Sequence, residues 1–269
     1  MTGGFLSNED RILGEAFLKD GYVIRGVEDR ASLDRIQARM AELAAAQLGL
    51  DPPNDPKAFL DDIHRHVEPE KLNAFRLAMI AGINGEPWFR RAYYGLAEKA
   101  LASLVGNELA MQRRANLSIQ LPGDESSLLP AHTDTWSGDS PFEAVVWIPL
   151  VDCRATKSMF ILPPAANARA AAKLSDYDSS GVEALYRDFE SEMRFLGVGY
   201  GQYLLFDQNL IHGNRVNRET TTRWTFNCRF KGLFTPYADK RLGEFFEPIT
   251  MRPATRLGLA YKLPEGFGG

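Results

Sequence analysis

The feature that most constrains the fold is a change of pattern near Met111, from helical periodicity to short runs typical of β-strands. Segments with apolar residues at helical spacing are 29–50, 70–83 and 87–106. Runs of β type, separated by Gly, Pro, Asp and Asn, are 113–123, 142–151, 158–164, 201–207 and 223–234. Because helices and strands do not alternate, a doubly wound parallel sheet is disfavoured. The pattern predicts an α+β fold in which a β-barrel or sandwich carries the site.

The domain organisation expected from this pattern is simple. A helix ending near Lys19 and a short β-type run precede the long helical part, and one helical insert over about 181–196 interrupts the later strands. No internal repeat or low-complexity linker divides the chain, so we predict a single domain over residues 1–269. Its expected parts are mainly helical support (1–110), a β-barrel core (111–234) and a loop-rich tail near the pocket (235–269).

Composition excludes several classes of partner. The net charge of −4 and the isoelectric point near 5.7 argue against general nucleic-acid binding, which needs a basic face. Two cysteines suit a reducing compartment better than a disulfide framework. No apolar stretch approaches the roughly 20 residues of a membrane span, and the N-terminal segment lacks the apolar core of a signal peptide. We therefore expect a cytoplasmic protein that acts on a small molecule; its oligomeric state is not predicted.

Histidine is scarce, which narrows any imidazole-based metal site to four candidates. His132 and Asp134 precede an apolar run, and residues two apart on a strand point to the same side. His212, after a later β-type run, is the best-placed third ligand. Two histidines and one carboxylate suit oxygen-activating iron(II), although an isolated His-x-Asp is also typical of a polar turn. His64 and His66 lie in a charged segment and are expected at the surface.

Two of the expected strands carry a polar face. The strand that begins eleven residues after His212 alternates polar and apolar side chains, so one face either lines a cavity or meets solvent. Its polar residues are Arg223, Thr225, Asn227 and Arg229. A guanidinium with a hydroxyl two residues on is well suited to hold a carboxylate. On the earlier strand, the residues that share a face are Arg114, Asn116, Ser118 and Gln120.

Together these motifs resemble the iron(II)- and 2-oxoglutarate-dependent oxygenases of the phytanoyl-CoA hydroxylase-like superfamily. The resemblance rests on "HTD" at His132, the histidine in "FDQNLIHGN", the arginine in "RWT" and the N-terminal "FLKDGYVIRGVEDRASLDRI". It extends to about Phe234. The stretch from "LSIQLPG" to "SMFILP" looks most like small oxygenases of bacterial carbohydrate-biosynthesis clusters.

The resemblance implies a double-stranded β-helix, the jelly-roll barrel of the cupins, buttressed by N-terminal helices. It implies Fe(II) as the metal, with 2-oxoglutarate and O₂ as co-substrates. The implied metal ligands, which are also the catalytic residues, are His132, Asp134 and His212. The implied co-substrate contacts are Arg223, Thr225, Asn116 and Gln120, with Arg223 and Thr225 on the far carboxylate of 2-oxoglutarate. Candidate substrate contacts are Trp136, Lys157, Asn227 and Arg229, a surface position being the alternative for Lys157.

The implied reaction is hydroxylation, or a related oxidation, of a C–H bond in a small polar metabolite such as a sugar or nucleotide-sugar, with release of succinate and CO₂. Many members carry a Gly-x-Leu…Gly-Ser-His stretch, where this chain has "TKSMFILPPAAN", so their substrate class does not transfer. Two alternatives stay open. One is a cupin-like metal enzyme that does not use 2-oxoglutarate, which would leave Arg223 and Thr225 without a role. The other is a catalytically silent sugar-binding barrel.

Overall fold

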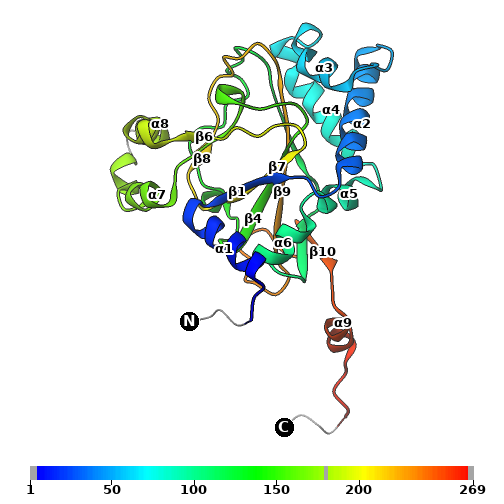
Figure 1. Ribbon diagram of the computed structural model, residues 1–269, viewed down its shortest axis with the longest axis vertical. Coiled ribbons are helices and arrows are strands. Elements are labelled where there is room, and N and C mark those ends of the chain that lie inside the picture. Colours follow the sequence, from blue (N-terminus) through cyan, green and yellow to red (C-terminus); the bar gives the residue numbers. More distant parts are fainter. Residues whose placement is uncertain (1–4, 179–180, 266–269) are drawn as a thin grey trace.

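A large antiparallel sheet forms the centre of the computed structural model, which describes residues 5–178 and 181–265 (Figure 1). The strand order is β1-β7-β4-β9-β2-β10, and β3 also pairs with β9. A second, smaller antiparallel sheet has the order β6-β5-β8. Helices α2 to α5 lie together along one side of the molecule, and α7 and α8 lie on the opposite side (Figure 1). The mixed helical and antiparallel architecture agrees with the expected α+β class.

The bounds of the elements are as follows. The large sheet contains β1 (Tyr22–Gly26), β2 (Leu109–Gln112), β3 (Asn116–Gln120), β4 (Glu143–Pro149), β7 (Gln202–Asp207), β9 (Arg223–Gly232) and β10 (Phe246–Thr250). The small sheet contains β5 (Phe160–Ile161), β6 (Arg194–Phe195) and β8 (His212–Gly213). The α-helices are α1 (Asn8–Asp20), α2 (Arg30–Leu48), α3 (Pro56–Asp61), α4 (Leu72–Asn84), α5 (Phe89–Gly95), α6 (Glu98–Leu104), α7 (Pro164–Ala171), α8 (Gly181–Phe189) and α9 (Pro253–Ala260). Among the shorter turns, the 3₁₀ helix η3 (Asp134–Ser137) belongs to the site.

Helix α2 shows how the sequence builds the helical support. The Asp29 side chain accepts a hydrogen bond from the Ser32 amide at its start, and Gly49 ends it in the left-handed conformation with φ of 69°. Leu33, Ile36 and Met40 recur at helical spacing on its buried face and are fully enclosed. Each such side chain contributes roughly 1.5–3 kcal/mol by leaving water, so packing against the sheet and the neighbouring helices stabilises α2.

Strand β9 has one face that packs into the hydrophobic core and one face that lies toward the site. Its apolar side chains are all fully buried and are Trp224, Phe226, Cys228 and Phe230. Trp224 packs edge-on against Phe75 of α4, and its indole nitrogen donates to the carbonyl oxygen of Leu60 at 2.9 Å. The alternating residues, which are polar, point to the opposite face. The helices therefore cover one face of β9 and leave the other free to line a cavity.

Several elements differ from those expected, and tertiary contacts account for two of the differences. The segment 87–106 forms two helices, because the Glu28 carboxylate accepts hydrogen bonds from the amides of Lys99 and Ala100 and begins α6 afresh. The helical insert ends at Phe189, and its last residues form strand β6 beside β5. Strands β2 and β10 and helix α7 were not expected.

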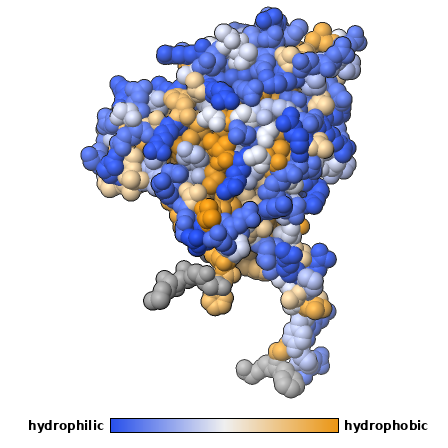
Figure 2. Space-filling model, viewed as in Figure 1, coloured by the Kyte–Doolittle hydropathy of each residue, from blue (hydrophilic) through white to orange (hydrophobic). Residues whose placement is uncertain are grey.

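The C-terminal tail lies partly against the body and partly away from it. Strand β10 pairs with β2 at the edge of the large sheet, whereas α9 stands away from the body (Figure 1). Figure 2 shows hydrophobic side chains on this arm, and none of the residues of α9 is buried. Residues 266–269 of the expected tail lie outside the described residues. None of the described helices is long and apolar enough to cross a membrane.

Gly213 marks a close approach between strand β8 and the segment that leads to His132. A Cβ atom at this position would lie 2.6 Å from the carbonyl oxygen of Leu129 and 2.9 Å from that of Pro130. It would also lie 2.9 Å from the ring of Phe160 on β5. Two backbone oxygens cannot move aside as a flexible side chain does, so the crossing requires glycine.

We expect Gly213→Ala to lower the free energy of unfolding by about 1–3 kcal/mol, because the methyl group forces the crossing segments apart. Since His132 follows that crossing, bound metal should be lost as well. Chemical denaturation and nickel titration measure the two effects. Gly14→Ala is the matched control, because a Cβ there meets nothing within 4 Å and alanine favours the helix. Equal stability of the two variants would contradict the close approach.

Candidate metal centre

The two site histidines lie side by side because their backbones pair. The His132 amide donates to the carbonyl oxygen of His212 at 3.0 Å, and the His212 amide donates to that of His132 at 2.8 Å. This isolated antiparallel bridge continues the small sheet beyond β8. The two imidazole rings lie with their centroids 4.4 Å apart. Segments separated by eighty residues of chain thus present two imidazoles at one place.

Asp134 reaches the same place from a turn, not from a strand. We expected His132 and Asp134 to point the same way on one strand, but Asp134 begins the 3₁₀ helix η3. Its backbone amide donates to the carbonyl oxygen of Gln208 at 3.2 Å. The expected strand geometry was wrong, although the side chain still meets both histidines.

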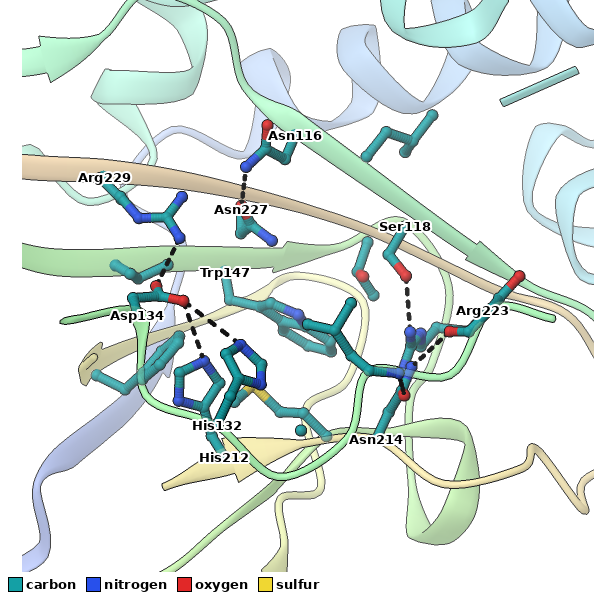
Figure 3. A pocket seen from close by; sticks show the side chains of 18 of the residues that line it. Asn116, Ser118, His132, Asp134, Trp147, His212, Asn214, Arg223, Asn227 and Arg229 are labelled. Atoms are coloured by element: carbon teal, nitrogen blue, oxygen red, sulfur yellow. Dashed lines mark hydrogen bonds and ion pairs between the residues drawn. The ribbon is translucent and has the colours of Figure 1, made fainter. Parts of the chain in front are cut away.

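The three side chains form a group that could hold a metal ion. One ligand atom from each of His132, Asp134 and His212 lies within 4.8 Å of the others. The Nε2 atoms of His132 and His212 lie 3.5 and 3.7 Å from Oδ1 of Asp134 (Figure 3). Each Nδ1 lies 2.8 Å from a backbone carbonyl oxygen, of Pro130 and Leu210 respectively, and donates to it. In the neutral form of each ring, the proton on Nδ1 leaves the Nε2 lone pair free for a metal.

The electrostatics hold Asp134 and His212 in the protonation states that bind metal, whereas His132 retains its proton to a higher pH. Burial opposes ionisation of Asp134, but the hydrogen bond with His132 and the charge of Arg229 outweigh it and hold the pKa of Asp134 well below its usual range. Burial lowers the pKa of His212 to about 4, so this imidazole is neutral near pH 7. For His132, burial is outweighed by the hydrogen bond with Asp134, and its pKa is raised above 6.5.

Arg229 gives the two carboxylate oxygens of Asp134 different partners. Its Nη2 lies 2.6 Å from Oδ2, while Oδ1 faces the histidines (Figure 3). A charge-assisted bond on Oδ2 favours coordination through Oδ1 alone, which keeps positions on the ion open for other ligands. Arg229 was expected to contact substrate; it lines the cavity, but its guanidinium is engaged with carboxylates.

A buried polar network holds Arg229 in turn. Its Nε lies 3.1 Å from Oδ1 of Asp139 and donates to Oε1 of Gln208 at 3.2 Å. The amide of Gln208 donates to the Glu143 carboxylate at 3.2 Å. Burial and the charge of Asp139 raise the pKa of Glu143 to about 7.

The C-terminal tail contacts this network. Its Lys240 forms an ion pair with Asp139, so the tail stabilises the side chains that hold Arg229. No described residue of that tail lines the cavity.

A cavity of about 370 Å³ opens beside the three candidate ligands. Arg223 lines it and is 4% exposed, with its Nη2 donating to Ser118 Oγ at 2.7 Å (Figure 3). Its Nε and the Oγ1 of Thr225 are buried without a hydrogen-bond partner. Burial lowers the pKa of Arg223 to about 10, and none of the described carboxylates forms an ion pair with it. Buried polar groups are normally paired, so these atoms indicate a place for an anion.

The remaining predicted residues fall into two groups. Asn116 and Asn227 line the cavity, and the Asn116 amide donates to the Asn227 side chain at 3.1 Å (Figure 3). Gln120, Trp136 and Lys157 are not among the lining residues. Gln120 is fully buried and donates to the Arg215 carbonyl oxygen, and Trp136 is 44% exposed.

Lys157 fits neither of the positions considered from the sequence. It is buried, with Nζ 2.6 Å from the Asp61 carboxylate and 2.7 Å from Thr221 Oγ1. The expectation of a surface lysine was wrong, and its ammonium is committed to an ion pair that ties α3 to the loop before β5.

Sequence reasoning missed other lining residues. Asn214 stands two residues after His212, and its side chain bonds the Leu129 amide and the Ser127 carbonyl; the spacing from His212 could have indicated it. Ser118 was placed on the correct face but not in the site. Arg76, Leu77 and Ile80 of α4 also line the cavity. Nothing in the local sequence connects that helix to the site.

Comparison with known proteins identifies similar structures but no similar sequence. No family model matches the chain, and no curated protein matches it significantly. The complex of the non-haem monooxygenase ThoJ with nickel is 17% identical, with a TM-score of 0.58 over 90% of this chain and 85% of that one. EctD from S. alaskensis with 2-oxoglutarate and 5-hydroxyectoine is 17% identical, with a TM-score of 0.56 over 88% and 80%. HygX from Streptomyces hygroscopicus with nickel and 2-oxoglutarate is 14% identical, with a TM-score of 0.52 over 88% and 90%. The chain therefore shares the fold of these proteins.

Arg229→Gln should weaken metal binding by about tenfold to a hundredfold, because Asp134 loses the partner that orients it. Arg229→Lys should have an intermediate effect, since it keeps the charge without the guanidinium fork. Nickel titration by calorimetry on folded protein measures this. Arg114→Gln, at an exposed position before β3, is the control for lost charge. An unchanged affinity in folded Arg229→Gln protein would show that Arg229 does not orient Asp134.

Metal affinity should fall as the pH drops through the pKa of His132, because the imidazole must lose its proton to become a ligand. That pKa is raised above 6.5, whereas His212, at about 4, is already neutral. We expect about a tenfold loss of affinity per pH unit below the pKa of His132, which is the slope for one proton. Nickel titrations across a pH series test this. A slope of two protons near pH 6 would contradict the lowered pKa of His212.

Proposed function

We propose that the protein is a non-haem Fe(II)- and 2-oxoglutarate-dependent oxygenase of the phytanoyl-CoA hydroxylase-like superfamily. Its two sheets would form the double-stranded β-helix of that superfamily, as a single cytoplasmic domain. The observation that carries the proposal is the presence of two features in one cavity: the group His132, Asp134 and His212, and the buried guanidinium of Arg223, whose Nε has no hydrogen-bond partner among the described residues. The shared fold with ThoJ, EctD and HygX supports it.

The residues of the cavity fit both the metal ion and 2-oxoglutarate. Two imidazole nitrogens and one carboxylate oxygen are donors that Fe(II) accepts, and the hydrogen bonds on both Nδ1 atoms orient the Nε2 lone pairs toward one point. The far carboxylate of 2-oxoglutarate would fill the place beside Arg223 Nε and Thr225 Oγ1, the two buried atoms that lack partners. A carboxylate bound there would repay the cost of burying a guanidinium without a counter-charge.

The proposed reaction is oxidation of a C–H bond, with 2-oxoglutarate and O₂ consumed and succinate and CO₂ released. Bound Fe(II) supplies the oxygen activation that this requires. The protein orients the reactants: Arg229 holds Asp134 for coordination through one oxygen, and Arg223 with Ser118 anchors the co-substrate. Trp147 and Phe206 line the cavity and are nearly buried, so they keep water from the reacting atoms.

The structure bears on both alternatives. A cupin-like enzyme without 2-oxoglutarate would leave Arg223 and Thr225 buried and unpaired without a ligand to compensate them. A silent barrel would not need both Nδ1 atoms bonded in the way that frees Nε2. For the substrate, the amides of Asn116 and Asn227 support a small polar metabolite such as a sugar or nucleotide-sugar.

Anaerobic titration with Fe(II) and 2-oxoglutarate tests the proposal. The metal–2-oxoglutarate chelate should produce a weak visible charge-transfer band that needs both components and disappears in His212→Ala. Arg223→Ala should raise the 2-oxoglutarate concentration for half-saturation by about tenfold or more, because a charge-assisted hydrogen bond contributes about 1.5–3 kcal/mol.

Arg218→Ala is the matched control for Arg223, since it removes an exposed guanidinium that does not line the cavity. A folded protein that binds iron without forming the band would support the cupin-like alternative. A protein that binds no iron would support the silent barrel. An unchanged 2-oxoglutarate dependence in Arg223→Ala would remove Arg223 from its proposed role.

A further inference from the structure

Among the residues that the structure describes, the charges lining the cavity leave one cation without a counterpart. The charged side chains of aspartate and arginine there are Arg76, Asp134, Arg223 and Arg229. Asp134 and Arg229 are paired at 2.6 Å, and Arg229 also contacts Asp139 at 3.1 Å. Under the proposed function, which this inference assumes, 2-oxoglutarate supplies the partner of Arg223. Arg76 is the charge that remains.

Arg76 lies on α4, which contacts β3 and contributes to the rim of the cavity. Its Nη2 donates to the Asn73 side chain one turn earlier, and among the described residues Arg76 forms no ion pair. It is half-buried, whereas its neighbour Leu77 is 56% exposed, so the helix meets both cavity and solvent. A half-buried guanidinium interacts with an anion more strongly than one in open water, because the local dielectric is lower.

Apolar side chains line the same cavity. Leu77 and Ile80 follow Arg76 on α4, and Leu129 and Met159 line the cavity from other segments. The side-chain amides of Asn116 and Asn227 also line the cavity and provide uncharged polar groups. A ligand that satisfies all of these has an anionic end, a less polar body and an atom that reaches the metal centre.

We propose that Arg76 determines the substrate class: the substrate carries a carboxylate or phosphate group that pairs with Arg76 while its C–H bond lies over His132, Asp134 and His212. Arg76 is thus a substrate-binding residue distinct from the co-substrate anchor Arg223. Each guanidinium binds a different anion: Arg223 binds 2-oxoglutarate in the buried part of the cavity, and Arg76 binds the substrate at the rim.

The test uses the protein loaded with Co(II) and 2-oxoglutarate and three fluorinated probes: para-fluorohydrocinnamate, para-fluorophenyl phosphate and the neutral para-fluorohydrocinnamide. Fluorine NMR relaxation near the paramagnetic Co(II) reports both binding and proximity to the metal. At least one anionic probe should bind roughly tenfold more tightly than the amide, the value expected for one charge-assisted hydrogen bond. Arg76→Gln should remove this preference, and Arg76→Lys should retain part of it.

Arg187→Gln, which removes a charge from α8 outside the cavity, is the control and should leave the preference unchanged. Tighter binding of the phosphate or of the carboxylate assigns the group that the substrate carries. Equal or undetectable binding of all probes, or a preference that survives Arg76→Gln, overturns the proposal. The chelate is measured in the same samples: if it fails to form, the proposed function fails, whereas a chelate without a preference for anions refutes only the role of Arg76.

Discussion

The reciprocal backbone hydrogen bonds between His132 and His212 are the interaction on which the rest of the site depends. They extend the small sheet to the residue just before η3, and they hold the two imidazole rings side by side. Gly213 permits this pairing because a side chain there would strike two carbonyl oxygens. The backbone of Asp134 is held by the bond from its amide to the Gln208 carbonyl oxygen, and Arg229 holds its carboxylate beside the histidines.

Several charged side chains are buried around this centre, and each is held by a neighbouring polar or charged group. The hydrogen bond with His132 and the charge of Arg229 hold the pKa of Asp134 below its usual range, and Arg229 is held by Asp139 and Gln208. Burying such groups is costly unless each has a partner, and here Arg229 and Lys240 form ion pairs with Asp139 while Arg229 also pairs with Asp134. Arg223 lies in the same cavity and forms no ion pair with any described residue. The contrast between the ion-paired network and a guanidinium without a counter-charge distinguishes the support of the site from its candidate binding surface.

Strand β9 connects the stability of the protein with its chemistry. Trp224 and Phe226 pack into the core under α4 and α5, while Arg223, Thr225, Asn227 and Arg229 line the cavity on the other face. A one-residue shift of its pairing with β4 would exchange the two faces. The buried aromatic residues therefore fix the register that presents Arg223 to the cavity, and this part of the site was predictable because period-two alternation is a local property.

The amino-acid sequence by itself determined what local periodicity and composition encode: the mainly helical first part, the clustered β-type runs after Met111, the polar face of β9 and the histidine candidates. Only the tertiary structure decided which polar residues meet. Arg229 binds Asp134, Lys157 is committed to Asp61 and Arg76 arrives from α4, each from a segment far away in the chain. Such contacts depend on the packing of whole elements, which no short spacing records. The sequence therefore indicated the chemistry of the site, and the fold assigned its individual side chains to metal, support and cavity.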